Sequence, residues 1–427
     1  MRKHTGQESG FTLIELLVVM AISMFVLVAA SKVMISMTTQ FKQQTRISEK
    51  SIEGGVGMEM IRRDISLAGF GLATGTYSGI NEFANTDWSF MNSTYKELDA
   101  GEKPGSFFQN PNKPPKMIEA HLLTDLAIID THGLNGSSYL TVRSPAVGSD
   151  PVAGRFVLSK KYVEGKFANT SSWDSGLLDP NQPDPDPDRD PKLTTSDLVV
   201  VVSTADKDNL GLVTDLANPT KFYANMDNNG RFGNFDPVEV GDIHVAYGVS
   251  NTGTALSAPF NRVDYYVGRT GVPEKCAPET GVLYRAQMLH ARKEKAALMQ
   301  GSPQLSPPEP PVRVMDCVAM MHVEFGIGNI TTSFLDTYTA ADIRKKLNRV
   351  DVFILTHEGQ FDPGYEYYDK DNTGEIILNP LSDNPDPAVF PAATKVKEHL
   401  VNGVPYWKHF RWRVYKLSGR PVGKGTF

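Results

Sequence analysis

The feature that most constrains this chain is an apolar segment near its start. Residues 11–30 carry one charged side chain, Glu15, and consist mainly of leucine, isoleucine, valine, alanine and methionine. A helix of about 20 residues rises about 30 Å, which matches the hydrocarbon core of a bilayer. We therefore predict that residues 11–30 form a membrane-spanning helix.

Two ordinary explanations of such a segment fit poorly. A secretory signal peptide has a basic start, as Arg2 and Lys3 provide here, but its cleavage site follows the apolar core. This core contains Glu15, and no clean small-x-small exit precedes a polar mature start. A plain signal anchor accounts for the length of the segment but not for Glu15. An unpaired carboxylate in lipid costs about 2.5–3.5 kcal/mol, so the segment predicts a partner for Glu15.

The residues around Glu15 resemble a known signal. Gly-Phe-Thr-Leu-Ile-Glu, from Gly10 to Glu15, follows a short basic leader, and this pattern is similar to the class III signal of type IV pilins and type II secretion pseudopilins. The resemblance implies that prepilin peptidase cuts after Gly10, that the new amino terminus at Phe11 is methylated, and that Glu15 helps bring the subunit into a filament. A buried carboxylate can be neutralised by the amino terminus of a neighbouring helix, which agrees with that role.

Helical character continues beyond the apolar segment. Residues 31–67 contain no proline, and apolar side chains recur at three- and four-residue steps, which predicts an amphipathic outer half of the helix over residues 31–68. The glycines at positions 54, 55 and 57 predict a kink or a melted turn. The apolar positions are Met58, Ile61, Ile65 and Ala68, and those expected on the opposite face are Glu59, Arg62, Arg63 and Asp64.

The remaining chain, residues 69–427, is expected to form a β-rich domain with long loops. The expected fold class is α+β, with the outer half of the helix packed on an antiparallel sheet. Residues 76–120 are expected to form a polar excursion, and residues 286–299 and 339–347 short helices. Strand-like runs occur at residues 126–129, 139–142, 156–158, 198–203, 243–249, 263–267, 281–285, 312–326, 349–357 and 410–415.

Later segments narrow the resemblance. The run from Ile61 to Phe70, the tripeptide at residues 283–285, the apolar strand at residues 350–355 and the arginine-bearing last strand together resemble PilW-type minor pilins. The resemblance implies a subunit that enters a type IV pilus near its tip and helps to initiate assembly. Its partners would be prepilin peptidase, other minor pilins, the major pilin and a tip adhesin. It would sit in the inner membrane, with the domain in the periplasm, before reaching the pilus on the cell surface.

Two alternatives stay open at this stage. One is a minor pseudopilin of a type II secretion system, which shares the signal, the helix and the fold class. The other is an adhesin or enzyme that borrows the pilin anchor. The chain has no HExxH, GxSxG or Walker A motif, so no enzymatic activity is predicted. A formal net charge of −6 argues against nucleic acid as the main partner.

The chain contains two cysteines, Cys276 and Cys317. In an oxidising compartment beyond the membrane we expect them to form a disulfide, which would close a loop of about forty residues and stabilise the fold by roughly 3–4 kcal/mol. Two separate buried thiols are the alternative.

Two stretches carry oxygen-bearing side chains at the alternating positions of an EF-hand loop, and Ca²⁺ is the cofactor they predict. In the first stretch the candidate ligands are Asn225, Asp227, Asn229 and Asp236. In the second they are Asp369, Asp371, Thr373 and Glu375. The alternative is that both stretches are turns whose side chains cap their own backbone.

Overall fold

The structure, a computed structural model, divides into two compact units, Met1–Ile52 and Glu53–Phe427. It describes residues 12–74, 115–122, 133–160, 172–174, 193–206, 209–227, 231–238, 242–251, 255–256, 258–269, 271–288, 290, 311–333, 335, 337–368, 376–377, 389–390, 400–401 and 404–421.

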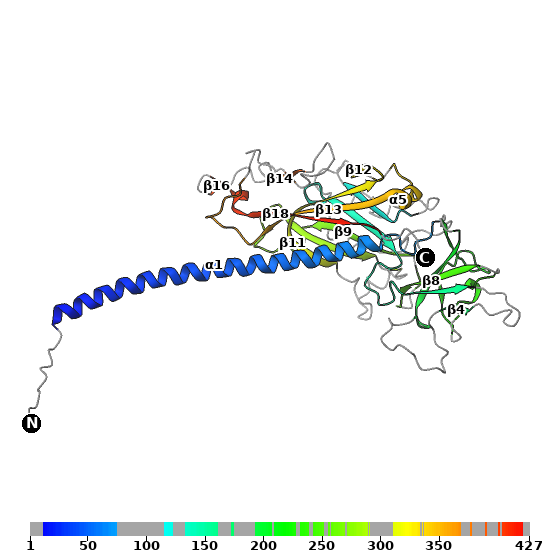
Figure 1. The fold of residues 1–427 in the computed structure, drawn as a ribbon, viewed down its shortest axis with the longest axis horizontal. Helices are drawn as coiled ribbons and strands as arrows, with labels where there is room; N and C mark the ends of the chain where they lie inside the picture. Colours follow the sequence, from blue (N-terminus) through cyan, green and yellow to red (C-terminus); the bar gives the residue numbers. More distant parts are fainter. Residues whose placement is uncertain are drawn as a thin grey trace, which may run out of the picture. The chain divides into compact units, whose positions relative to one another are not determined.

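Helix α1 runs from Leu13 to Leu67 without interruption (Figure 1). In its apolar part the hydroxyls of Ser31, Thr38 and Thr39 donate hydrogen bonds to the carbonyl oxygens four residues earlier, at 2.8, 2.8 and 2.9 Å. Such bonds satisfy a hydroxyl group within the helix itself, so these side chains are compatible with an apolar environment.

A large antiparallel sheet forms the centre of the Glu53–Phe427 unit. Its strand order is β1-β2-β9-β10-β11-β13-β18, with β12 paired to β11. This arrangement confirms the predicted α+β fold with an antiparallel sheet. The strands are β1 (Ile118–Leu122), β2 (Ser138–Ser144), β9 (Asn261–Gly268), β10 (Gly281–Met288), β11 (Val312–Ile327), β12 (Ile330–Thr332), β13 (Leu347–Glu358) and β18 (Arg411–Gly419).

A second antiparallel sheet has the order β4-β3-β8-β5-β6, with β7 paired to β5. Phe70, just beyond the end of α1, packs edge-on against Tyr247 of β8 and Phe156 of β3, with ring centroids 5.4 and 5.9 Å apart. The strands are β3 (Phe156–Lys160), β4 (Ser172–Asp174), β5 (Leu198–Asp206), β6 (Asn209–Leu212), β7 (Ala224–Asn225) and β8 (Ile243–Ser250).

The remaining described elements are short. Helix α5 (Ala340–Lys346) begins with a capping box, in which Thr339 and Asp342 each bond the other's backbone N–H. The others are α3 (Gly133–Gly136), η3 (Gly233–Phe235), η4 (Tyr406–His409), and the strand pairs β14 (Ile376–Ile377) with β15 (Val389–Phe390) and β16 (Leu400–Val401) with β17 (Val404–Pro405).

The last turns of α1 pack against the large sheet. Ile61, Ile65 and Ala68 are fully buried in the core that the sheet also lines. The melted turn predicted at the glycines is wrong, because residues 54–57 lie within the continuous helix. Gly57 serves a close approach to the sheet. A Cβ atom at Gly57 would lie 2.7 Å from the carbonyl oxygen of Val314 in β11.

Two other local predictions are wrong. Strand β10 continues to Met288, so the helix expected over residues 286–299 does not begin at Ala286; most of that range lies outside the described residues. Strand β1 begins at Ile118, inside the excursion expected over residues 76–120. Its apolar and polar residues alternate, and its backbone pairs with β2.

Candidate functional site

The amino-terminal signal lies at the start of α1. Gly10 and Phe11 are outside the described residues, and the first described residue is Thr12. The Thr12 hydroxyl accepts a hydrogen bond from the Glu15 backbone N–H at 3.3 Å, and Glu15 Oε2 accepts one from the Thr12 backbone N–H at 2.9 Å. The Thr12 hydroxyl also donates to Glu15 Oε2 at 2.9 Å.

These bonds form a capping box, which satisfies donors that a helix leaves open at its start. Within the single chain, therefore, the Glu15 side chain caps the amino-terminal end of α1. We did not predict this role, although the Thr-x-x-Glu spacing of residues 12–15 is the sequence signature of a capping box. An assembly role for Glu15 stays a prediction.

The apolar part of α1 presents its side chains to the outside. Within the described part of the chain, Leu13–Lys42 is the one helical stretch long and apolar enough to cross a membrane. Leu13 is 84% exposed and Phe25 is 78% exposed. An apolar surface this extended needs lipid or other apolar helices to cover it.

At the other end of α1, Asp64 forms a buried ionic cluster with the large sheet. Asp64 Oδ2 accepts hydrogen bonds from Arg285 Nε of β10 at 2.7 Å and from the Tyr265 hydroxyl of β9 at 2.6 Å. The exposed fractions of Asp64 and Arg285 are 4% and 8%, and Tyr265 is fully buried. The cluster fastens the helix to adjacent strands through charge as well as apolar packing.

The surroundings keep Tyr265 and Arg285 in their bonding states. Burial, together with the charge of Asp64, raises the pKa of Tyr265 well above its ordinary value, so its hydroxyl remains a donor. Burial alone would lower the pKa of Arg285, but the hydrogen bond and charge of Asp64 outweigh it, and that pKa is raised.

Placing Asp64 on the polar face of the helix was therefore wrong. Its position fits the buried stripe, because Ile61, Asp64, Ile65 and Ala68 follow the i, i+3, i+4, i+7 pattern of one helix face.

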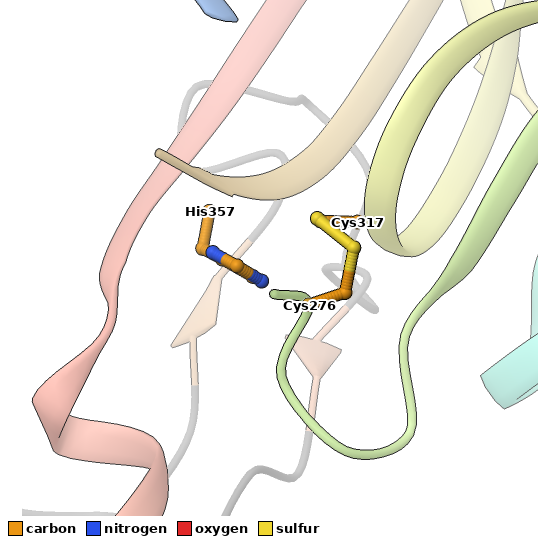
Figure 2. A group of neighbouring side chains, drawn as sticks. All are labelled: Cys276, Cys317 and His357. Atoms are coloured by element: carbon orange, nitrogen blue, oxygen red, sulfur yellow. A yellow bond between two sulfur atoms is a disulfide. The ribbon is translucent and has the colours of Figure 1, made fainter. Parts of the chain in front are cut away.

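The two cysteines form a disulfide that links the loop before β10 to β11. Their Cα atoms are 5.0 Å apart and 41 positions apart in sequence. The imidazole of His357 lies beside the bridge (Figure 2). Closing a loop of this length stabilises a fold by roughly 3–4 kcal/mol in the chain-entropy model.

The structure describes part of the first predicted calcium stretch. Asp227 Oδ1 accepts a hydrogen bond from the Arg231 backbone N–H at 2.8 Å, and Asp236 Oδ1 accepts one from the Phe232 backbone N–H at 3.1 Å. The Asn225 side-chain amide donates to the Asp197 carbonyl oxygen at 3.4 Å. These contacts are those of a side-chain-capped turn.

The other candidate ligands lie outside the described residues. They are Asn229 in the first stretch and Asp369, Asp371, Thr373 and Glu375 in the second. Calcium binding therefore stays a prediction for both stretches.

Comparisons with known proteins agree with the signal. Residues 6–31 match the family model of the prokaryotic N-terminal methylation motif. Among solved structures, the chain is similar to a type IV-like pilin from Thermus thermophilus, with 10% sequence identity and a TM-score of 0.20 over 54% of this chain and 86% of that chain. No curated protein sequence matches the chain.

The features that define the class are present in the chain itself. A methylation motif leads into a long, apolar helix, and the helix is followed by a domain built on antiparallel sheets. In this combination of a methylation motif, a long apolar helix and an antiparallel-sheet domain, the chain is similar to type IV pilin-like proteins.

Proposed function

We propose that the protein is a PilW-type minor pilin. Prepilin peptidase cuts it after Gly10 and methylates Phe11, and the mature chain stays in the inner membrane through the apolar part of α1. It then enters a type IV pilus near the tip and helps to initiate assembly with other minor pilins, the major pilin and a tip adhesin.

The observation that carries this proposal is the methylation motif at residues 6–31 leading into the exposed apolar stretch Leu13–Lys42. Lipid covers such a surface before assembly, and neighbouring apolar helices can cover it in a filament. The disulfide supports a domain outside the cytoplasm, because such bonds persist in oxidising compartments.

The size of the domain supports a minor role at the tip. The Glu53–Phe427 unit holds two multi-stranded sheets, so it is much larger than a single helix. If the α1 helices of neighbouring subunits pack together, their axes lie only about 8–10 Å apart. A subunit repeated along a filament must fit its domain between close neighbours above and below. A tip subunit has no neighbour above it, so a large domain is tolerated there.

Deletion of the gene, followed by complementation, tests the proposal. We expect few or no surface pili by electron microscopy, normal export of type II secretion substrates, and recovery of pili with the wild-type gene. Gly10→Val should fail to restore pili, whereas Gly6→Val, a matched change elsewhere in the leader, should restore them.

Other outcomes would favour the alternatives. Normal pili with lost secretion would instead indicate a pseudopilin. Normal pili with lost surface attachment would indicate a pilin-anchored adhesin.

A further inference from the structure

The described non-glycine residues with a left-handed backbone gather around the disulfide. They are Asn135, Glu279 and Cys317, with φ values of 60°, 62° and 58°. The Asn135 side-chain amide donates to the carbonyl oxygens of Glu279 and Ala319, at 2.8 and 2.6 Å. Glu279 shares the loop between β9 and β10 with Cys276. A left-handed backbone is uncommon for residues with a side chain, and it persists where the surrounding contacts impose it, as at switches.

Cys317 lies in a β-bulge of β11. The pairing of β11 with β10 shifts register between Val318 and Met315, where β11 contains one residue more than β10. A bulge residue with a left-handed backbone is normally glycine, because a Cβ atom is unfavourable there. Cys317 carries a side chain at such a position, and its covalent bond to Cys276 holds it there.

The bulge determines how α1 rests on the sheet. Among the described strands, Asp316 has no partner in the register of β11 with β10 or β13, and its backbone N–H donates instead to Glu53 Oε1 of α1 at 2.8 Å. One turn later in α1, a Cβ atom at Gly57 would lie 2.7 Å from the carbonyl oxygen of Val314. Residues four apart share one face of a helix. This face of α1 therefore rests on the part of β11 that directly precedes Cys317.

The loop that carries Cys276 has support of its own. Its Ala277 backbone N–H donates to Nε2 of His357, which lies beside the bridge, at 2.8 Å (Figure 2). The Cys276 N–H donates to the Pro273 carbonyl oxygen at 3.0 Å, and the Thr280 hydroxyl donates to the Ala277 carbonyl oxygen at 2.6 Å. None of these bonds involves a sulfur, so the loop stays in place when the bridge is open, and the change falls on β11.

The contacts of β11 with β13 allow a second conformation at Cys317. The Thr356 hydroxyl lies 2.9 Å from the Cys317 carbonyl oxygen and 3.1 Å from the Asp316 carbonyl oxygen. A hydroxyl has one proton to donate, so Thr356 keeps an acceptor whichever of the two carbonyls turns towards it. The bulge can therefore move without leaving this donor unpaired.

We propose that the Cys276–Cys317 bridge is a redox switch that seats α1 on the large sheet. With the bridge closed, Cys317 is held in the left-handed conformation and the Asp316 N–H points to Glu53. With two thiols, Cys317 returns to the extended conformation that a strand residue prefers, the bulge moves, and the Asp316 N–H turns away from Glu53. The glycine-rich turn at residues 54–57 then loses its support, and it melts because glycine weakens a helix.

Closure of the bridge is a two-electron oxidation. One cysteine thiolate attacks a disulfide-bearing oxidant and forms a mixed disulfide, and the other thiolate then displaces the oxidant. The oxidant leaves as two thiols, which carry the two protons that the cysteines give up. The newly made chain, which has two thiols, therefore keeps this turn of α1 unseated until such an oxidant acts. This inference concerns the Glu53–Phe427 unit and does not rest on the pilus role.

Hydrogen exchange of the full-length chain in detergent, read by mass spectrometry, tests the switch. A phosphine opens the bridge by taking an oxygen atom from water, which leaves two thiols and a phosphine oxide. The amides of residues 53–57 and 314–318 should then exchange faster than in the disulfide form by about tenfold or more. The amides of residues 61–67, which the Asp64 cluster holds, should exchange at the same rate in both forms.

Variants of the two cysteines separate the effect of the backbone conformation from the loss of a cross-link. Cys276→Ser should exchange like the reduced chain. Adding Cys317→Gly should restore slow exchange without any bridge, because glycine adopts a φ of 58° without strain. Adding Cys317→Ala instead keeps a Cβ atom, so this matched double variant should exchange as fast as Cys276→Ser.

Three results would overturn the proposal. The first is equal exchange at residues 53–57 in the disulfide and dithiol forms of the wild type. The second is equal exchange in the double variants with Cys317→Gly and with Cys317→Ala. The third is a reduced chain that also loses protection at residues 61–67, because the bridge would then stabilise the whole unit rather than set one turn of α1.

Discussion

Replacing Asp64 with alanine should strongly destabilise the Glu53–Phe427 unit. The change leaves Arg285 buried without its carboxylate and removes the acceptor of the Tyr265 hydroxyl. Two short hydrogen bonds, at 2.7 and 2.6 Å, are lost, and bonds to charged groups contribute about 1.5–3 kcal/mol each. Removing one partner of a buried ion pair costs about 3–5 kcal/mol. Both estimates place the loss near 4 kcal/mol.

Three further variants separate charge from packing. Asp64→Asn keeps an acceptor oxygen without the charge and should lose about 2 kcal/mol. The double variant Asp64→Leu with Arg285→Met replaces the pair by apolar side chains and should recover the part of the loss that comes from the unpaired charge, whereas the Tyr265 hydroxyl still lacks its acceptor. Glu59→Ala removes an exposed carboxylate of the same helix, 3.9 Å from Arg62, and should change stability by less than about 0.5 kcal/mol.

The assay is urea unfolding of the full-length chain in detergent micelles, followed by tryptophan fluorescence. The midpoint and slope give the free energy of unfolding. A loss below about 1 kcal/mol for Asp64→Ala would refute the account of the cluster. A double variant as unstable as Asp64→Ala would refute the argument that the loss comes from an uncompensated buried charge.

Three other predictions follow from single groups. Glu15→Ala should insert and be cut after Gly10 but assemble poorly. Glu15→Gln keeps the capping box without the charge, so assembly as poor as that of Glu15→Ala assigns the effect to the charge. Normal assembly of both variants contradicts an assembly role for Glu15. Burial lowers the pKa of His290 from 6.5 to about 3. Between these two pH values the unfolded chain therefore binds a proton at His290 that the folded chain does not bind. Stability should therefore fall by about 1.4 kcal/mol per pH unit as the pH drops from about 6.5 towards 3, and an equal pH dependence in His290→Gln would exclude this cause. Calorimetry of the full-length chain with Ca²⁺ should show binding heat that Asp371→Ala or Asp227→Ala removes, whereas no heat and an unchanged melting temperature would leave both stretches as plain turns.

The sequence predicted best those elements whose signal is local. The apolar run and the absence of proline indicated one long helix, and β-branched runs indicated most central strands, such as β5 and β13. The predicted run at residues 126–129 lies outside the described residues. Strand β1 was missed because its alternating side chains follow a long polar stretch and pair with a strand that comes later in the chain.

The errors came from contacts that a single sequence does not display. A glycine in a helix indicates weakness by propensity, yet Gly57 allows the backbone of β11 to approach the helix. Asp64 has a charged side chain, which usually indicates a solvent-facing position, but its partner Arg285 lies 221 positions later in the chain. The position of His357 beside the cysteines likewise depends on the pairing of β11 with β13.

Mass spectrometry of sheared, purified pili tests the central claim most directly. The account predicts that this protein is present in them at a small fraction of the major pilin, and that its amino-terminal peptide begins at Phe11 and carries one methyl group on its amine. A protein that is absent from the pili of a strain that produces it, or that is present there with residues 1–10 still attached, would contradict the account.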